Sequence, residues 1–179
     1  MKYKIAVFGS AKEDTPKEIC NLAEEIGKEI ALKGHILITG AAKGISTFAA
    51  KGAKEIGGHV IGISPTTHDS EKRDYEVDFE FIDEVIHTGE GYKGRNVISV
   101  RKCDGMISVR GGFGTLNEIT ISEGEGKPIV ALKGSGGCSD IVKEIFDKLN
   151  PNYEYFALAR TSVEAVDKVI EMIKEKNSV

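Results

Sequence analysis

Glycine-rich loops that follow short apolar segments are the feature of this sequence that most limits its possible folds. Five four-residue segments consist largely of apolar and β-branched residues: 5–8, 36–39, 60–63, 106–109 and 129–132. Four of them are followed within two residues by glycine, and the fifth by Ser64-Pro65. Short, nearly continuous apolar segments are typical of strands buried on both faces of a parallel sheet. The sequence therefore predicts a parallel sheet with glycine loops along one edge.

In the segments between these strands, apolar residues recur with helical periodicity. The sequence Thr15-Pro16-Lys17-Glu18 forms a capping box with proline at the first helical position, and Thr161 to Glu164 forms a second box. Further helices are predicted over residues 45–56, 95–102, 115–123, 139–149 and 161–176. Alternating strands and helices indicate one Rossmann-like, doubly wound α/β domain over residues 1–179, with a mainly parallel sheet and helices on both faces.

Charge and composition exclude several classes of function. With 24 basic and 28 acidic residues the net charge is −4, which argues against a nucleic-acid partner, because phosphate binding by such proteins needs clustered Lys and Arg. No apolar run approaches the roughly 20 residues that cross a bilayer, so no membrane partner is expected. The three cysteines are odd in number and far apart, as for reduced thiols in a cytoplasmic protein. The histidines lack metal-ligand spacing, so no metal site is expected.

The loop at residues 111–118 carries the clearest chemical signal. Its glycines follow a predicted strand and open a predicted helix, and Thr115 offers a hydroxyl at the helix N-cap. Glycines let the backbone approach an anion closely, and a helix N-terminus presents free N–H groups at its positive end. In open α/β sheets ligands bind at this edge. The loop therefore predicts a phosphate cradle, whereas a dinucleotide fingerprint and a Walker A sequence are both missing.

The segment Gly111-Gly112-Phe113-Gly114-Thr115-Leu116-Asn117-Glu118 resembles the G-G-x-G-T-x-x-E motif of the Lonely Guy (LOG) family. That family includes cytokinin-activating phosphoribohydrolases, molybdenum cofactor carrier proteins and proteins once labelled lysine decarboxylases. Residues 7–10, 39–45, 53–63 and 94–96 extend the resemblance over roughly residues 4–135. It implies a ligand site formed by Gly9, Ser10, Gly40, Gly111, Gly112, Phe113, Gly114 and Thr115, and a homodimer.

The resemblance also implies roles for two charged residues. Glu118 would contact the sugar or act in glycosidic cleavage, but it also completes a capping box with Thr115. Arg95 would bind phosphate or assist the leaving group, because a guanidinium matches phosphate with a bidentate fork; otherwise it is a solvated or ion-paired surface residue. The polar segment from Ser64 to Phe79 is either a functional lid, with Thr66, Thr67 and His68 over the ligand, or a surface loop.

Two departures from the family pattern separate the possible functions. Arg110 stands where the phosphoribohydrolases have proline, and Tyr92-Lys93-Gly94-Arg95-Asn96 stands where they have M-x-x-R-K. Both favour the molybdenum cofactor carrier-like branch. The resemblance therefore predicts binding of a nucleotide-like or pterin ligand that bears a phosphate, such as molybdenum cofactor, with no cofactor required for activity. The alternative is an enzyme that hydrolyses a nucleoside 5′-monophosphate to free base and ribose 5-phosphate.

Overall fold

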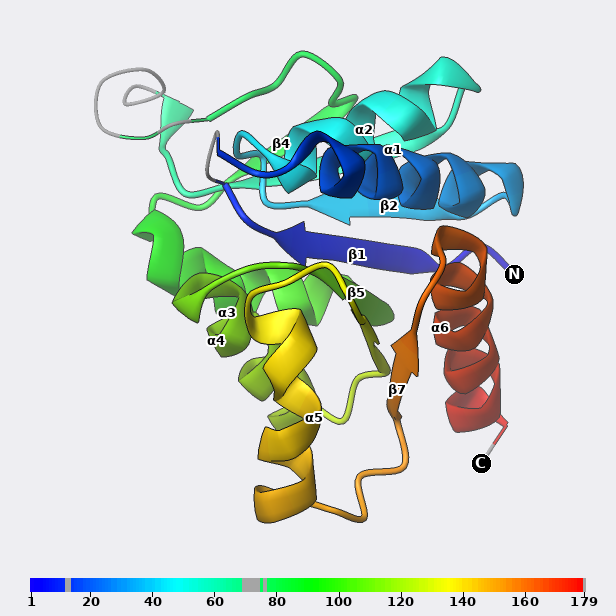
Figure 1. Cartoon of the computed structure of the whole chain (residues 1–179). Coiled ribbons are helices and arrows are strands. Elements are labelled where there is room, and N and C mark those ends of the chain that lie inside the picture. Colours follow the sequence, from blue (N-terminus) through cyan, green and yellow to red (C-terminus); the bar gives the residue numbers. More distant parts are fainter. Residues whose placement is uncertain (12–13, 69–74, 76, 179) are drawn as a thin grey trace.

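A parallel sheet forms the centre of the molecule. The computed structural model describes residues 1–11, 14–68, 75 and 77–178 (Figure 1). Within this described part the strands are β1 (Lys4–Gly9), β2 (Ile36–Thr39), β3 (His59–Ser64), β4 (Glu84–His87), β5 (Gly105–Val109), β6 (Ile129–Leu132) and β7 (Phe156–Ala159). Their order is β4-β3-β2-β1-β5-β6-β7, and each adjacent pair is parallel. The predicted Rossmann-like α/β class is therefore confirmed.

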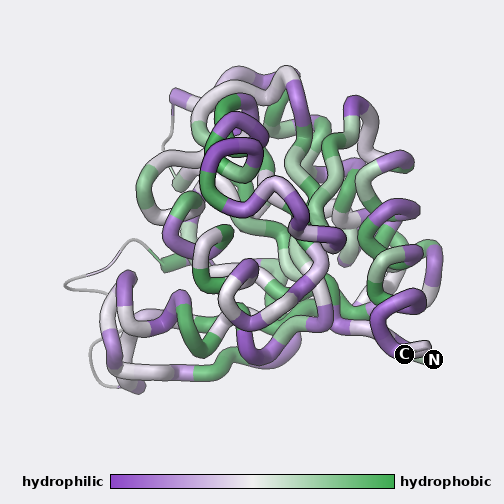
Figure 2. Tube along the Cα trace, turned by 90° about the horizontal axis from the view of Figure 1, so that it is seen from below, coloured by the Kyte–Doolittle hydropathy of each residue, from purple (hydrophilic) through white to green (hydrophobic). Residues whose placement is uncertain are grey.

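Helices cover both faces of this sheet. They are α1 (Lys17–Leu32), α2 (Ile45–Glu55), α3 (Gly91–Lys102), α4 (Phe113–Gly124), α5 (Cys138–Leu149) and α6 (Ser162–Asn177). Helices α1, α2 and α6 pack with Ile5 and Val7 in one core cluster, and α3, α4 and α5 pack with Ala6 and Phe8 in another. Successive residues of β1 thus face opposite sides, as strand geometry requires. Figure 2 shows hydrophilic positions recurring along the outer sides of the helices.

Several predicted boundaries are wrong. Helix α4 begins at Phe113 and not at Thr115, so Gly112 is the N-cap and Thr115 lies within the first turn. Helix α1 begins at Lys17 after Pro16, one residue later than the capping box at Thr15 requires. The second predicted cap is confirmed, since the Thr161 side chain accepts a hydrogen bond from the Glu164 N–H. The edge strands β4 and β7 were not predicted.

The sheet order places a topological switch between β1 and β5. The chain runs from β1 outward through β2 and β3 to β4, and then crosses to β5 on the other side of β1. Gly9 at the end of β1 pairs with Val109 at the end of β5. Because the loops after these two strands lead in opposite directions, they leave a crevice at the carboxyl edge, where ligands bind in folds of this kind.

Candidate functional site

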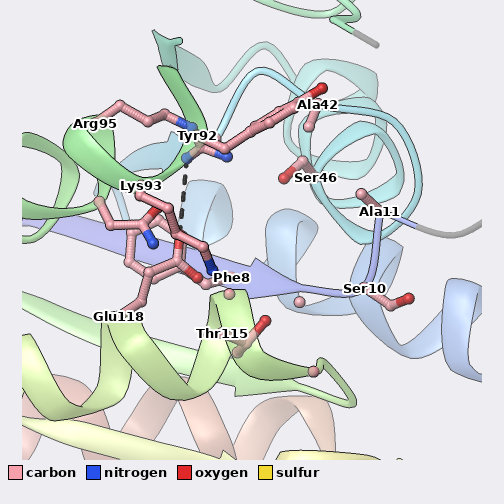
Figure 3. Close-up of a pocket in the computed structure, with 15 residues that line it drawn as sticks. Phe8, Ser10, Ala11, Ala42, Ser46, Tyr92, Lys93, Arg95, Thr115 and Glu118 are labelled. Atoms are coloured by element: carbon pink, nitrogen blue, oxygen red, sulfur yellow. Dashed lines mark ion pairs between the residues drawn. The ribbon is translucent and has the colours of Figure 1, made fainter. Parts of the chain in front are cut away.

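A cleft of about 370 Å³ opens at this switch point. Eight predicted site residues line it: Gly9, Ser10, Gly40, Arg95, Gly112, Gly114, Thr115 and Glu118. They come from the ends of β1 and β2 and from α3 and α4, so the fold brings together residues more than 100 positions apart in sequence. Figure 3 shows Arg95 and Glu118 pointing toward one another across the cleft.

Two predicted ligand residues lie outside this lining. Phe113 is 87% exposed, so the prediction that it contacts the ligand is not supported by its position in this chain. Gly111 has φ +83°, and a Cβ atom there would lie 2.5 Å from the Thr115 Cβ atom. Gly111 therefore allows the tight turn that brings Thr115 against the loop, which is a structural reason for glycine at this position.

The glycine loop and the start of α4 form an open, polar wall of the cleft. A Cβ atom added at Gly112 or Gly114 would meet nothing within 4 Å. The Leu116 N–H donates to the Gly112 carbonyl as the first bond of the helix. The preceding N–H groups, from Phe113 to Thr115, have no intrahelical acceptor, as at every helix start. This end of α4 therefore presents amide donors and a positive dipole end beside open space, an arrangement suited to an anion.

Arg95 and Glu118 form a buried charged pair inside the same cleft. Their side chains are 9% and 7% exposed, and Arg95 Nη1 lies 3.7 Å from Glu118 Oε1. This separation exceeds hydrogen-bond length. Among the described residues, Arg95 Nε and Nη1 are buried and have no hydrogen-bond partner. Unbonded buried donors on a guanidinium are costly, so a hydrogen-bond acceptor within the cleft would stabilise this side chain.

Burial dominates the electrostatics of the pair. It lowers the pKa of Arg95 from its ordinary value, and it raises the pKa of Glu118 to about 7. Attraction between the opposite charges opposes both shifts and does not cancel them. The position of Glu118 also excludes a capping role, because it lies in the second turn of a helix that begins at Phe113. A carboxyl group that titrates near neutrality within a cleft is a candidate functional group.

The guanidinium of Arg95 rests on the backbone of Gly40. A Cβ atom at residue 40 would lie 2.5 Å from Arg95 Nη1 and 2.6 Å from Nη2. The backbone at Gly40 is not in the left-handed region, so alanine could adopt it. Gly40 lines the cleft, and this contact indicates that it also positions Arg95.

We therefore expect Gly40→Ala to fold normally and to displace the guanidinium of Arg95. Loss of one charge-assisted hydrogen bond to a bound anion would weaken binding about tenfold or more. Titration with AMP measures this effect, and Gly124→Ala is the matched control because Gly124 faces open space at the far end of α4. Equal affinity of the two variants would contradict the positioning role.

Two residues other than glycine adopt left-handed backbone conformations beside the site. Ala41 has φ +50° and follows Gly40, and Arg110 has φ +57° and precedes the glycine loop. Each such conformation costs roughly 1–2 kcal/mol for an L-residue. Strained residues of this kind persist where the surrounding structure holds them, and they cluster at functional sites. Both stand at the carboxyl edge of the sheet.

The lid hypothesis for the segment from Ser64 to Phe79 is only partly covered, because residues 69–74 and 76 lie outside the described residues. Thr66 is fully buried, and its hydroxyl lies 2.7 Å from Ser64 Oγ and 3.2 Å from His87 Nδ1. Thr66, Thr67 and His68 do not line the cleft. Tyr75 of this segment does contact the rim, where its ring and the Tyr92 ring pack in a T-shaped arrangement.

Helix α3 contributes residues that the sequence motif did not single out as ligand contacts. Tyr92, Lys93 and Asn96 all line the cleft, and the Asn96 amide donates to Asn117 Oδ1 at 2.8 Å. In sequence, these three positions stand out only as departures from the family pattern. Across the part of the chain that the structure describes, no group of three or more His, Cys, Asp and Glu side chains could hold a metal ion. None of the described helices is long and apolar enough to cross a membrane.

The sequence is similar to those of known proteins. The chain matches the model of the SLOG cluster4 family over residues 2–166. An uncharacterized protein of Archaeoglobus fulgidus is 41% identical over 130 residues, which cover 73% of this chain and 80% of that protein. A probable cytokinin riboside 5′-monophosphate phosphoribohydrolase of Oryza sativa subsp. japonica is 31% identical over 117 residues, 65% of this chain. The chain covers 49% of that enzyme, about half its length.

Solved structures of similar proteins cover nearly the whole chain. The molybdenum cofactor carrier protein of Chlamydomonas reinhardtii superposes with a TM-score of 0.79 at 30% identity, over 97% of this chain and 99% of that chain. The molybdenum cofactor binding protein of Rippkaea orientalis superposes with a TM-score of 0.78 at 30% identity, over 99% of this chain and 98% of that chain.

Proposed function

Because the chain belongs to the SLOG cluster4 family, we propose that its cleft binds a nucleotide-like or pterin ligand that bears a phosphate, as a carrier of molybdenum cofactor would. The resemblance to the Lonely Guy family and to its carrier-like members is confirmed by the family match and the structural neighbours. The observation that carries the proposal is the buried Arg95 guanidinium, whose Nε and Nη1 have no partner among the described residues, in the cleft that also holds the start of α4.

Different residues of the cleft would bind the two parts of such a ligand, the phosphate and the heterocycle. Amides at the start of α4 and the Thr115 hydroxyl would hold the phosphate, because a helix N-terminus favours an anion. Tyr92 at the rim is 40% exposed and offers an aromatic face, while the nearby Asn96 is 97% buried with an amide in the lining. An aromatic ring and an amide suit a planar, hydrogen-bonding heterocycle.

The alternative function is hydrolysis of the N-glycosidic bond of a nucleoside 5′-monophosphate. Glu118 favours it, because this carboxyl group lies in the cleft beside Arg95. In that reaction water would add to the ribose C1′, the C1′–N bond would break, and the base would leave with a proton. An ionised Glu118 would stabilise the positive charge that develops on the ribose.

Incubation with AMP and other nucleoside monophosphates tests both functions. The purified protein is first analysed by mass spectrometry for a co-purified ligand, and nucleotide affinity and release of free base are then measured. Firm binding without base release supports the carrier function, and base release supports the enzyme. Absence of a co-purified phosphate-bearing ligand together with no measurable nucleotide binding would contradict both.

We also propose a homodimer in which apolar surface on α4 and α5 is covered by a second copy. A groove of about 200 Å³ runs between these helices, lined mainly by apolar side chains such as Leu116, Val142 and Leu149. Leu149 is 81% exposed. Val100 of α3 is fully buried within its own chain, so it offers no apolar surface to a second copy.

Light scattering at micromolar concentration measures the state of assembly. We expect a mass of twice the 19.3 kDa chain, and we expect Leu149→Glu to shift the protein toward the monomer, since it places a charge on an apolar surface. A wild-type mass equal to one chain would contradict the dimer.

A further inference from the structure

The loop between β6 and α5 forms hydrogen bonds with the backbone that leads into the glycine loop. We call residues 133–140, which comprise this loop and the first three residues of α5, the clamp loop. It lies outside the cleft lining, yet it forms hydrogen bonds on both sides of Arg110. We infer that Ser135 and Ser139 of the clamp loop are positioning residues that fix the direction of the anion-binding amides at the start of α4. The inference rests on the proposed anion site.

Ser135 fixes the amide side of Arg110. The Arg110 N–H donates to Ser135 Oγ at 2.7 Å, and the Ser135 hydroxyl donates to the Leu132 carbonyl at 2.6 Å. Ser135 is 2% exposed, so these bonds lie away from water. Buried hydrogen bonds of this type favour one backbone orientation because the alternative leaves a donor without a partner.

Ser139 fixes the carbonyl side of the same residue. The Arg110 carbonyl accepts from the Ser139 N–H at 3.0 Å and from the Ser139 hydroxyl at 2.9 Å. One residue further on, the Gly111 carbonyl accepts from the Cys138 N–H at 3.0 Å. Both peptide groups that flank the turn are therefore held by the clamp loop.

The clamp loop is itself closed to an anion. The Asp140 carboxylate accepts hydrogen bonds from the Gly134 N–H at 2.6 Å and from the Gly136 N–H at 3.1 Å. An external anion would have to displace this carboxylate and would be repelled by it. The glycines of this loop thus serve its shape, and the loop acts on the neighbouring turn.

The turn needs such support because Arg110 adopts φ +57° and Gly111 adopts φ +83°. A proline at residue 110 could not adopt this conformation, since its ring fixes φ near −65°. Arginine instead of proline therefore marks a different backbone path before the glycines. The Arg110 side chain also follows the clamp loop, because a Cβ atom at Gly136 would lie 2.8 Å from Arg110 Nη1.

Release of the clamp would let Arg110 relax toward an ordinary backbone conformation. Gly112 follows two residues later, and the free amides of α4 begin at Phe113. A relaxed turn would leave these amides in many orientations, so an anion would have to order them on binding. Affinity falls in proportion to the fraction of molecules that hold the competent arrangement.

Ser139→Ala and Ser135→Ala test the inference, with Ser122→Ala as the control. Ser122 is equally buried on α4, and its hydroxyl donates to Met106 Sδ away from the cleft. We expect each clamp variant to bind AMP about tenfold more weakly, which corresponds to loss of one hydrogen bond. In the AMP-free protein we expect lower ¹⁵N order parameters at residues 112–115. Ser122→Ala should change neither quantity, even if it lowers the thermal midpoint as much as the clamp variants do.

The two measurements separate this inference from the proposed function. The positioning role is supported if the order parameters at residues 112–115 fall in the clamp variants and do not fall in the Ser122→Ala control. Unchanged order, or the same AMP affinity in clamp and control variants, overturns it. If wild-type protein binds no AMP, the proposed anion site fails for this ligand class, and the order parameters still decide whether the clamp loop orders the turn. A variant that does not fold leaves the decision to the other clamp variant.

Discussion

Gly114→Val is expected to weaken AMP binding strongly and to leave the fold intact. Gly114 lies in the first turn of α4 and lines the cleft, and a Cβ atom there would meet nothing within 4 Å. The branched side chain would therefore project into the space that the proposed phosphate occupies. Loss of two charge-assisted hydrogen bonds, at about 1.5 kcal/mol each, would weaken binding about 100-fold.

Gly124→Val controls for the substitution itself. Gly124 ends the same helix, and a Cβ atom there also meets nothing within 4 Å, but it does not line the cleft. We expect it to retain wild-type affinity by calorimetric titration. Near-equal affinities of Gly114→Val and wild type would place the anion elsewhere and would contradict the cradle.

The strands that could be predicted are those buried on both faces. Residues 36–39 and 129–132 form β2 and β6 with the predicted bounds. Their side chains are largely apolar on both faces of the strand, which is typical of a strand covered on both sides. The two missed strands are the edges of the sheet. Residues 84–87 are only half-buried or exposed, and residues 156–159 contain two alanines, which favour strands weakly. Their pairing depends on tertiary neighbours that no local pattern reveals.

The candidate site was predicted where one continuous motif carries it. The loop from Gly111 to Glu118 and the ends of β1 and β2 were found because glycine follows each strand. The contribution of α3 was underestimated, because the approach of Tyr92, Lys93 and Asn96 to the cleft depends on how α3 packs against α4. Helix α4 also begins earlier than predicted, since Gly112 at its N-cap and Gly114 in its first turn suggested a loop.

The backbone conformation of Arg110 could not be predicted from its residue type. In sequence, its presence in place of proline serves only to favour the carrier-like branch. In the structure its backbone adopts φ +57°, a conformation that proline cannot adopt. The hydrogen bonds that stabilise this conformation come from residues 25 and 29 positions further along the chain. No spacing rule connects these segments before the fold is known.

Glu118→Gln is expected to separate the enzyme from the carrier. If the protein cleaves nucleoside monophosphates, the variant loses the negative charge that faces the developing positive charge on the ribose. The rate of base release should then fall on the order of 100-fold. If the protein is a carrier, AMP binding should persist without base release in both forms. Glu125→Gln is the matched control, because it disrupts a Glu–Arg pair with Arg101 at the exposed surface. Equal rates of release in wild type and Glu118→Gln would exclude catalysis by this carboxylate.

The same variant should change how stability depends on pH. Burial raises the pKa of Glu118 from its ordinary 4.5 to about 7, so between these values the folded protein keeps a proton that the unfolded chain releases. The unfolding free energy of wild type relative to Glu118→Gln should therefore fall as pH rises from about 4.5 to 7, by up to about 3 kcal/mol. Above pH 7 the difference should be constant, because both states are then ionised. Urea unfolding at pH 5 and pH 8 measures it, and a difference that does not change with pH would show that Glu118 titrates as an ordinary exposed carboxyl group.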